Sequence, residues 1–245
     1  LSFTGSEASR YGGGGGLRNL QLYNTFGTAG TAYGTAIQLL FTSTALRPTW
    51  VRIENINIEQ GSSAGTWTYC LDMDASAAVT SDSLRDYWVS GCRMLCETGG
   101  TAAVRLQKVI ALHWRDNIIN GAMGNMSITG DATVSSAQSW IHGGGGCTLA
   151  LDYADNIHVS ASLWTDITDT VNTTNTTIRG SKFTNHVKLN GTGFADYYKE
   201  SEYTHIHQAT GSNYIFSRDE GAGDTTNGVG VAIGTAVLGA FLGAA

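Results

Sequence analysis

The chain has 245 residues, of which 32 are glycine, one is proline and only 14% are charged. Its 42% hydrophobic content, with regularly spaced Val, Ile and Leu, excludes an intrinsically disordered chain, because such chains combine high charge with few large apolar residues. The formal net charge is −6, and the basic residues are scattered among the acidic ones, so we expect no nucleic-acid partner.

A short strand pattern recurs along the chain. Residues 17–22 (LRNLQL) align with residues 53–58 (IENINI), and both alternate apolar and polar side chains with the period of two expected of a half-buried β-strand. Further copies are predicted at 84–89, 106–111, 153–159 and 175–180, and other short apolar runs lie at 36–41, 69–73, 126–129 and 147–151. The chain is therefore predicted to be all-β.

Signals for tight hairpins are scarce. Asn-Gly and Asp-Gly pairs occur only at 120–121, 190–191 and 227–228, so most strands have no hairpin partner in sequence. This favours a solenoid over a sandwich. In a solenoid each coil buries its apolar face against the coils above and below, so we expect aliphatic side chains to stack inside and Asn19 to stack on Asn55 at a bend.

The repeat divides the chain into three predicted regions. Residues 1–16 form a Gly-rich lead-in, residues 17–193 the solenoid, and residues 194–245, where the pattern fades, a small C-terminal cap or oligomerisation module. Residues 225–245 carry no charge, but Gly, Ala and Thr dominate them. Close backbone packing in an assembly explains these small residues better than a membrane span does.

The cysteines are Cys70, Cys92, Cys96 and Cys147, and three of them lie in apolar or strand-like stretches. Their spacing is not that of a zinc site. We interpret them as buried thiols rather than as a disulfide framework.

The strand pattern resembles a known family. From Gly16 onward the chain reads GLRNLQLYN, GTAIQLL, RPTWVRIENINIE and GTWTYCLDMDAS, followed by LRDYWVSGCR. These segments resemble the pectate-lyase-like right-handed parallel β-helices of bacteriophage tail spikes and tail fibres, over residues 12 to about 193. The resemblance implies a right-handed, single-stranded parallel β-helix that assembles as a homotrimer in a virion.

The resemblance also implies a function. Such spikes bind, and often cut, a bacterial surface polysaccharide, so a host-surface glycan and other tail or capsid proteins are the implied partners. Two alternatives stay open. The chain could be a polysaccharide depolymerase of the same fold, or a purely structural appendage of the particle.

Asp72 and Asp74 are the candidate catalytic pair for the depolymerase. Alternate residues of a strand share one face, which places these carboxylates about 7 Å apart, within the range of an inverting glycoside hydrolase. A lyase would need an Arg or Lys base beside acidic residues, and no acidic cluster is predicted beside the strand arginines. We therefore rank a lyase below a hydrolase, and surface carboxylates without a catalytic role remain the alternative.

Tryptophans recur about once per predicted coil and could form a platform for sugars, since aromatic side chains are enriched at recognition surfaces. We predict exposed sugar contacts at Trp114, Asp116, Trp164 and Asp166. The alternative is that these aromatic residues belong to the core or to a trimer contact.

The stretch YTHIHQ places His205 and His207 on the same face of a predicted strand. Imidazole is a common ligand of transition metals, and three chains around an axis would supply six. The arrangement resembles the iron-binding sites of trimeric phage fibres. We therefore expect no cofactor other than a metal ion at a trimer axis, with ordinary polar strand residues as the alternative.

Overall fold

Strands make up the regular structure of the residues that the structure describes. The computed structural model describes residues 1–5, 15–41, 49–61, 64–77, 84–170, 172–189, 194–197, 202–208, 213–216 and 230–232. These ranges contain no α-helix, and hence no apolar helix of membrane-spanning length. The predicted all-β class is confirmed.

Consecutive strands alternate between two parallel ladders. The first ladder contains β1 (Ser2–Gly5), β3 (Thr35–Phe41), β5 (Tyr69–Asp74), β8 (Val104–Gln107), β11 (Met126–Thr129), β13 (Gly145–Asp152), β15 (Leu163–Asp169), β17 (Lys182–Leu189) and β19 (Glu202–Gln208). The second ladder contains β2 (Gly15–Asn24), β4 (Thr49–Gln60), β6 (Leu84–Ser90), β9 (Val109–Arg115), β12 (Ser136–His142), β14 (Ala154–Ser160), β16 (Thr174–Arg179), β18 (Phe194–Tyr197) and β20 (Asn213–Phe216). A short third ladder joins the end of β4 to β7 (Arg93–Leu95), β10 (Ile118–Asn120) and the start of β13.

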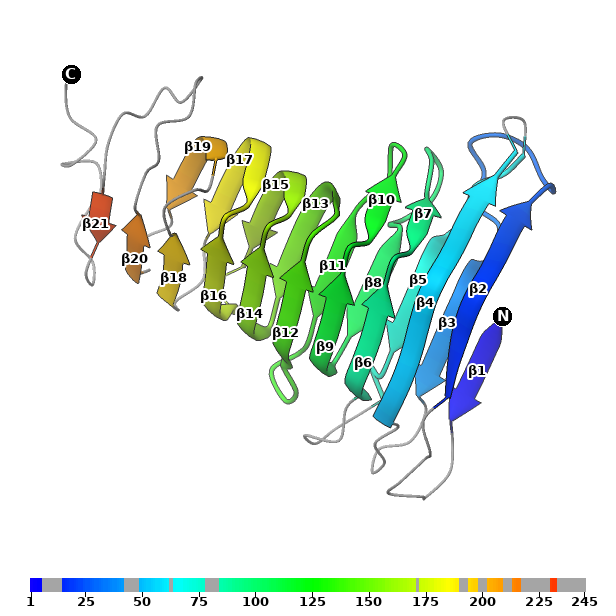
Figure 1. The fold of residues 1–245 in the computed structure, drawn as a ribbon, viewed down its shortest axis with the longest axis horizontal. Coiled ribbons are helices and arrows are strands. Elements are labelled where there is room, and N and C mark those ends of the chain that lie inside the picture. Colours follow the sequence, from blue (N-terminus) through cyan, green and yellow to red (C-terminus); the bar gives the residue numbers. More distant parts are fainter. Residues whose placement is uncertain are drawn as a thin grey trace.

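This connectivity is the one that a parallel β-helix requires, because each strand pairs with its equivalent one coil later (Figure 1). The coils shorten along the chain: Asn19 and the aligned Asn55 are 36 residues apart, whereas His142 and the aligned Ser160 are 18 apart. Parallel pairing continues past residue 193 through β18, β19 and β20, and β20 then pairs antiparallel with β21 (Gly230–Ala232). The rest of residues 225–245 lies outside the described ranges.

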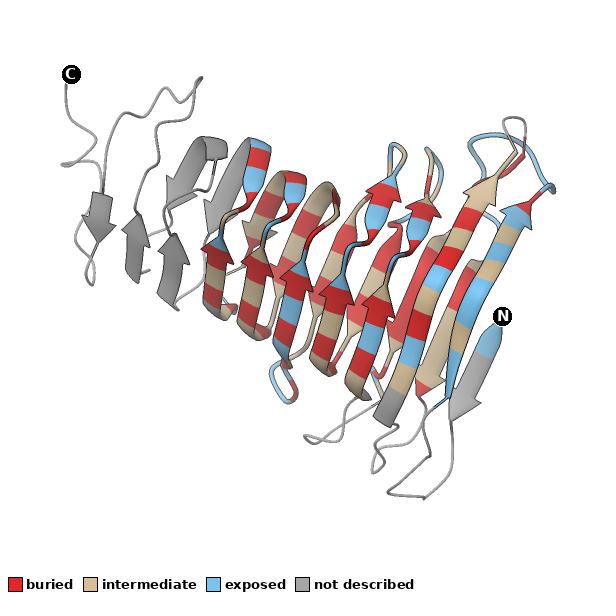
Figure 2. Cartoon of the chain, viewed as in Figure 1, coloured by how far each residue is buried: buried red, intermediate tan, exposed pale blue. Residues whose placement is uncertain are grey.

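Apolar side chains, most of them aliphatic, stack along the inside of both ladders, which appears as aligned buried bands in Figure 2. In the first ladder the inner column is Ile37, Leu71, Val104, Met126, Leu149 and Ile167. In the second it is Ile53, Val89, Trp114, Ile141, Val159 and Ile178. Each column member is at most 1% exposed, so each coil depends on its neighbours for its core, as predicted.

A column of left-handed residues bends the second ladder in each coil from Asn19 to Gly180. A single residue with positive φ bends the strand, and Asn, Asp and Gly tolerate this conformation best. The column consists of Asn19, Asn55, Gly91, Asp116, Gly143, Ala161 and Gly180, with φ between 49° and 68°. The Nδ2 of Asn55 donates to the Oδ1 of Asn19 at 3.3 Å, which confirms the predicted stacking of Asn on Asn.

The first two copies of the sequence repeat pair as predicted, with Leu17 opposite Ile53. The third copy is misaligned in the prediction, because Val89 and not Leu84 pairs with Ile53. The predicted copy at residues 106–111 is also wrong as a single strand, since β8 ends before Lys108 and β9 begins after it.

The cysteine prediction is confirmed for the most part. All four thiols are free, and Cys70, Cys92 and Cys96 are buried, whereas Cys147 is half-buried. Burial raises the pKa of Cys92 above its usual value, so this thiol is unreactive at neutral pH.

Candidate functional site

Four ring side chains stack on the outer face of the second ladder, one from each of four consecutive strands. They are Trp88, His113, Trp140 and His158, and we refer to them as the aromatic row. Successive ring centroids are 3.9, 5.0 and 6.1 Å apart, and the ring planes are within 13° of parallel. The backbone pairing places these residues directly opposite one another, so the stack follows from the stacking of coils.

Strand alternation turns these rings outward. In β9, Leu112 and Trp114 are buried and His113 lies between them. The same alternation places Trp140 between the buried Ser139 and Ile141 in β12. The aromatic row therefore lies on the outer face of the same strands whose inner face carries the buried column of the second ladder.

The aromatic row is open to solvent. Trp88 and Trp140 are 40% and 41% exposed, a large apolar exposure for two aligned indoles. The guanidinium of Arg52 lies 5.9 Å from the Trp88 ring centroid and extends the row by one strand through a cation–π contact.

His113 is the inner member of the row, stacked between the two indoles. Burial lowers the pKa of His113 below its usual value, and the carboxylate of Asp86 opposes this shift without cancelling it. The ring is therefore neutral at pH 7 and can both donate and accept a hydrogen bond.

A second outward row follows two residues further along each strand. It consists of Arg115, His142, Ser160 and Arg179, and we refer to it as the basic row. Ser160 Oγ and His142 Nδ1 are hydrogen-bonded at 3.0 Å, and Arg115 pairs with Asp116 at 3.2 Å with both side chains largely exposed.

An open pocket of about 330 Å³ lies between the two rows. Its lining comes from three neighbouring strands and consists of Trp88, His113, Trp114, Arg115, Trp140 and His142. Five members of the two rows, Trp88, His113, Trp140, Arg115 and His142, thus border one shallow groove on the surface.

Asp72 and Asp74 lie on the outer face of the first ladder, beside each other as their spacing predicts. Arg105 of β8 binds both: its Nε and Nη2 donate to the two Asp72 oxygens at 2.8 and 2.7 Å, and Nη2 donates to Asp74 at 3.3 Å. Gln38 also donates to Asp72 at 3.2 Å, and the guanidinium lies 4.5 Å from the Tyr69 ring centroid. The sequence analysis did not find Arg105 as the partner of this pair.

This arrangement fits a structural ion pair better than a general acid and base. The Asp72 side chain is 1% exposed, and both of its oxygens accept hydrogen bonds from Arg105. An acid or base must reach the atom to which it transfers a proton. A carboxylate enclosed in this way offers no such access.

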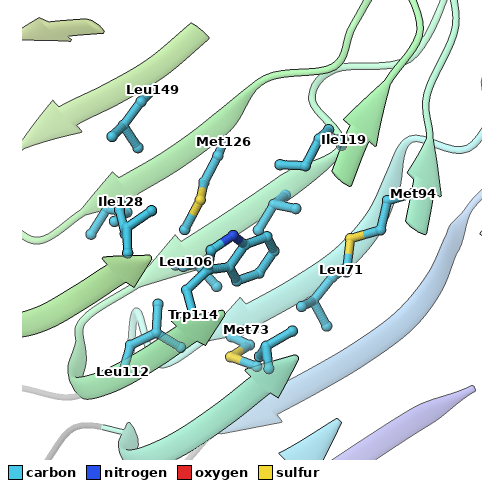
Figure 3. Packing of buried hydrophobic residues seen from close by; sticks show 14 of the residues in the cluster. Leu71, Met73, Met94, Leu106, Leu112, Trp114, Ile119, Met126, Ile128 and Leu149 are labelled. Atoms are coloured by element: carbon cyan, nitrogen blue, oxygen red, sulfur yellow. The ribbon is translucent and has the colours of Figure 1, made fainter. Parts of the chain in front are cut away.

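Trp114 and Trp164 are not surface residues, which corrects the prediction that both are exposed sugar contacts. Each is 1% exposed, and Figure 3 shows the Trp114 indole within the cluster formed by Leu71, Leu106 and Met126. Trp164 fits inside because its ring lies over Gly146, where a Cβ would be only 3.0 Å from the indole.

The structure does not bring the four predicted sugar contacts together. Asp116 is exposed at a bend just after β9, in the second ladder, where it pairs with Arg115. Asp166 is half-buried in β15, in the first ladder. Of the four residues, Trp114 contributes to the lining of the pocket between the two rows, and Asp116 lies beside this pocket through its pair with Arg115.

His205 and His207 lie in β19, but their side chains lie outside the described residues. The backbone pairs His205 with His186 of β17. Among the side chains that the structure describes, no three His, Cys, Asp or Glu residues gather as a metal site would require. The metal site at these two histidines stays a prediction.

Comparisons of the chain with protein-family models, with curated proteins and with solved structures found no match. The candidate site therefore depends on the geometry of this chain alone. Within that geometry, the groove between the aromatic row and the basic row is the strongest candidate.

Proposed function

We propose that this protein is a bacteriophage tail spike or tail fibre: a right-handed parallel β-helix, assembled as a homotrimer, that binds a polysaccharide on the host surface. The binding surface would be the outer face of the second ladder. The observation that carries the proposal is the aromatic row, which exposes two aligned tryptophans to solvent.

A stack of coils suits a polymeric ligand. Neighbouring strands lie about 4.8 Å apart, so the positions from Arg52 to His158 extend for about 19 Å along the stack. Equivalent side chains repeat along this length. A polymer of similar units could contact them in successive coils and gain affinity from several weak contacts at once.

Binding without cleavage is the form of the function that we propose. The Asp72 carboxylate is enclosed by Arg105 and Gln38, and we assign it to stability. The geometry offers no observation in favour of the depolymerase.

A binding experiment tests the proposal. Labelled protein would be incubated with a panel of bacteria and their purified surface polysaccharides, and its solution mass measured by sedimentation. We expect a trimer that binds one polysaccharide, and a loss of at least about tenfold in affinity for the double variant Trp88→Ala and Trp140→Ala, since aromatic side chains that a ligand covers dominate recognition. Tyr23→Ala is the matched control, because Tyr23 is an exposed aromatic residue outside the row.

Three outcomes would overturn the proposal. Blank binding across the panel would favour a purely structural appendage. Release of oligosaccharide that disappears in Asp72→Asn would favour the depolymerase. Equal loss of affinity in Tyr23→Ala and in the double variant would place the binding surface elsewhere.

A further inference from the structure

We propose that the ligand of the groove is an anionic polysaccharide, lying parallel to the stack of coils with its acidic groups directed at Arg115 and His142. This inference rests on the proposed function and adds the chemical class of the ligand. Three features of the groove support it.

The first feature is the orientation of the rings. The members of the aromatic row face one another along the stack, so their faces are occupied by their neighbours and their edges are what solvent reaches. An aromatic ring is electron-rich on its face and electron-poor at its edge. The exposed edges therefore attract oxygen atoms, and negatively charged oxygens most strongly.

The second feature is the charge of this face. The chain as a whole carries a net charge of −6, yet the two rows and the strand position before them contain three arginines, Arg52, Arg115 and Arg179. Three carboxylates lie near these rows: Glu54 is engaged by Arg18 at 2.7 Å and by Arg52 at 3.9 Å, Asp116 pairs with Arg115, and Asp86 acts on His113. With Arg18 counted, four arginines face these three carboxylates. A basic face on an acidic protein favours an anionic ligand.

The third feature is the state of Arg115. Its guanidinium lines the groove and pairs with Asp116, the next residue in the chain, at 3.2 Å. Both side chains are largely exposed, and an exposed pair contributes little free energy, so a ligand carboxylate can replace Asp116 at small cost. The planar fork of a guanidinium matches a carboxylate with two hydrogen bonds, which Asp116 does not use fully.

The spacing of the two rows supports an orientation of the polysaccharide parallel to the stack of coils. The two rows are two residues apart along each strand, or about 7 Å, and each repeats about every 4.8 Å along the stack. A polysaccharide lying between the two rows would have ring edges on one side and Arg115 and His142 on the other. A polysaccharide lying along a single strand would meet each row only once.

The test compares matched polymers. Each acidic polysaccharide of the bacterial panel would be paired with the same polymer after chemical reduction of its carboxyl groups to alcohols, and neutral polysaccharides would be included. We expect binding to an acidic polymer that falls at least about tenfold after carboxyl reduction and again in Arg115→Gln, since hydrogen bonds to charged groups contribute the most. Binding should also weaken with added salt.

Arg93→Gln is the matched control, because Arg93 is an exposed arginine on the third ladder, away from the groove. It should bind like the original protein. Equal binding of the acidic polymer and its reduced form, or a preference for a neutral polymer that Arg115→Gln leaves intact, overturns this inference while the proposed function stands. Binding to no polymer at all overturns the proposed function and this inference together.

Discussion

The outer faces of the two ladders use charge in opposite ways. On the first ladder, Asp72 and Asp74 are held by Arg105 from the next coil, so opposite charges neutralise each other within the protein. On the second ladder, the aromatic row and the basic row point to solvent, and the ion pair of Arg115 is an exposed one. We call the outer face of the first ladder the closed face, because its charges are paired within the protein, and that of the second ladder the open face, because its side chains are exposed to solvent.

The difference shows how a stack of coils separates stability from recognition. Both faces are built from side chains two residues apart on aligned strands. Complementary partners in adjacent coils, such as Asp72 and Arg105, satisfy each other and hold the coils in register. Like partners, such as Trp88 and Trp140 with His113 between them, leave their edges unused. A candidate site is therefore found where aligned residues do not neutralise one another.

The largest expected effect comes from breaking the closed face. Arg105→Met leaves the Asp72 carboxylate buried without a counter-charge, and we expect a loss of about 3 kcal/mol in the free energy of unfolding, measured by chemical denaturation. Arg115→Met is the control from the open face, and it should change stability by less than about 0.5 kcal/mol. Equal losses in both variants would remove the distinction between the faces.

A double variant sharpens this result. Replacing Asp72 by Leu together with Arg105→Met removes the buried charge as well as its partner, so most of the lost stability should return. If the double variant is no more stable than Arg105→Met, the ion pair is not the cause of the loss.

The open face should tolerate change better. Trp140→Ala removes ring contacts with His113 and His158, each of which contributes about 0.5–1.5 kcal/mol, and we expect a loss of about 1–2 kcal/mol because the indole is partly exposed. Trp114→Ala, one coil earlier but in the core, should cost about 3–5 kcal/mol. Denaturation curves of the two variants would show which tryptophan belongs to the core, and equal losses would contradict the assignment.

The architecture could be predicted from the sequence because its signal is local. Period-two alternation and the lack of hairpin turns indicate stacked coils, and the pair Asn19 and Asn55 fixes the first bend. The alignment failed at the third coil because the bend there is Gly91, while Asp86 resembles the expected Asn. Asp86 also has positive φ, but it belongs to a different column of bends, with Ala111, Gln138 and Asn156.

The positive-φ bends also explain why the candidate site could not be predicted from the sequence. Ala111 has a φ of 58° and adds one residue to the alternation of β9, so that Leu112 and Trp114 turn inward and His113 turns outward. Alanine does not signal a left-handed bend in a sequence, since Asn, Asp and Gly are the residues that favour it. Without this bend the inward and outward residues of β9 exchange, so strict alternation does not reveal that Trp114 turns inward and His113 outward. The prediction of Trp114 as a sugar contact rests on the recurrence of tryptophan and on its polar neighbours, and it misses His113.

The smallest expected effect is a dependence of the open face on pH. Burial lowers the pKa of His113 in the folded protein, so the unfolded chain takes up a proton first as the pH falls below about 6.5. The stability that His113 contributes is therefore complete above this pH and decreases below it, until the folded pKa is reached.

Comparing denaturation of the original protein with that of His113→Gln between pH 8 and pH 5 isolates this contribution. The difference in unfolding free energy between the two proteins should shrink as the pH falls. If this difference instead grows on acidification, the protonated ring is stabilised between the indoles. The stabilisation would come from cation–π contact with Trp88 and Trp140 and from the carboxylate of Asp86, and it would make the aromatic row more stable at low pH.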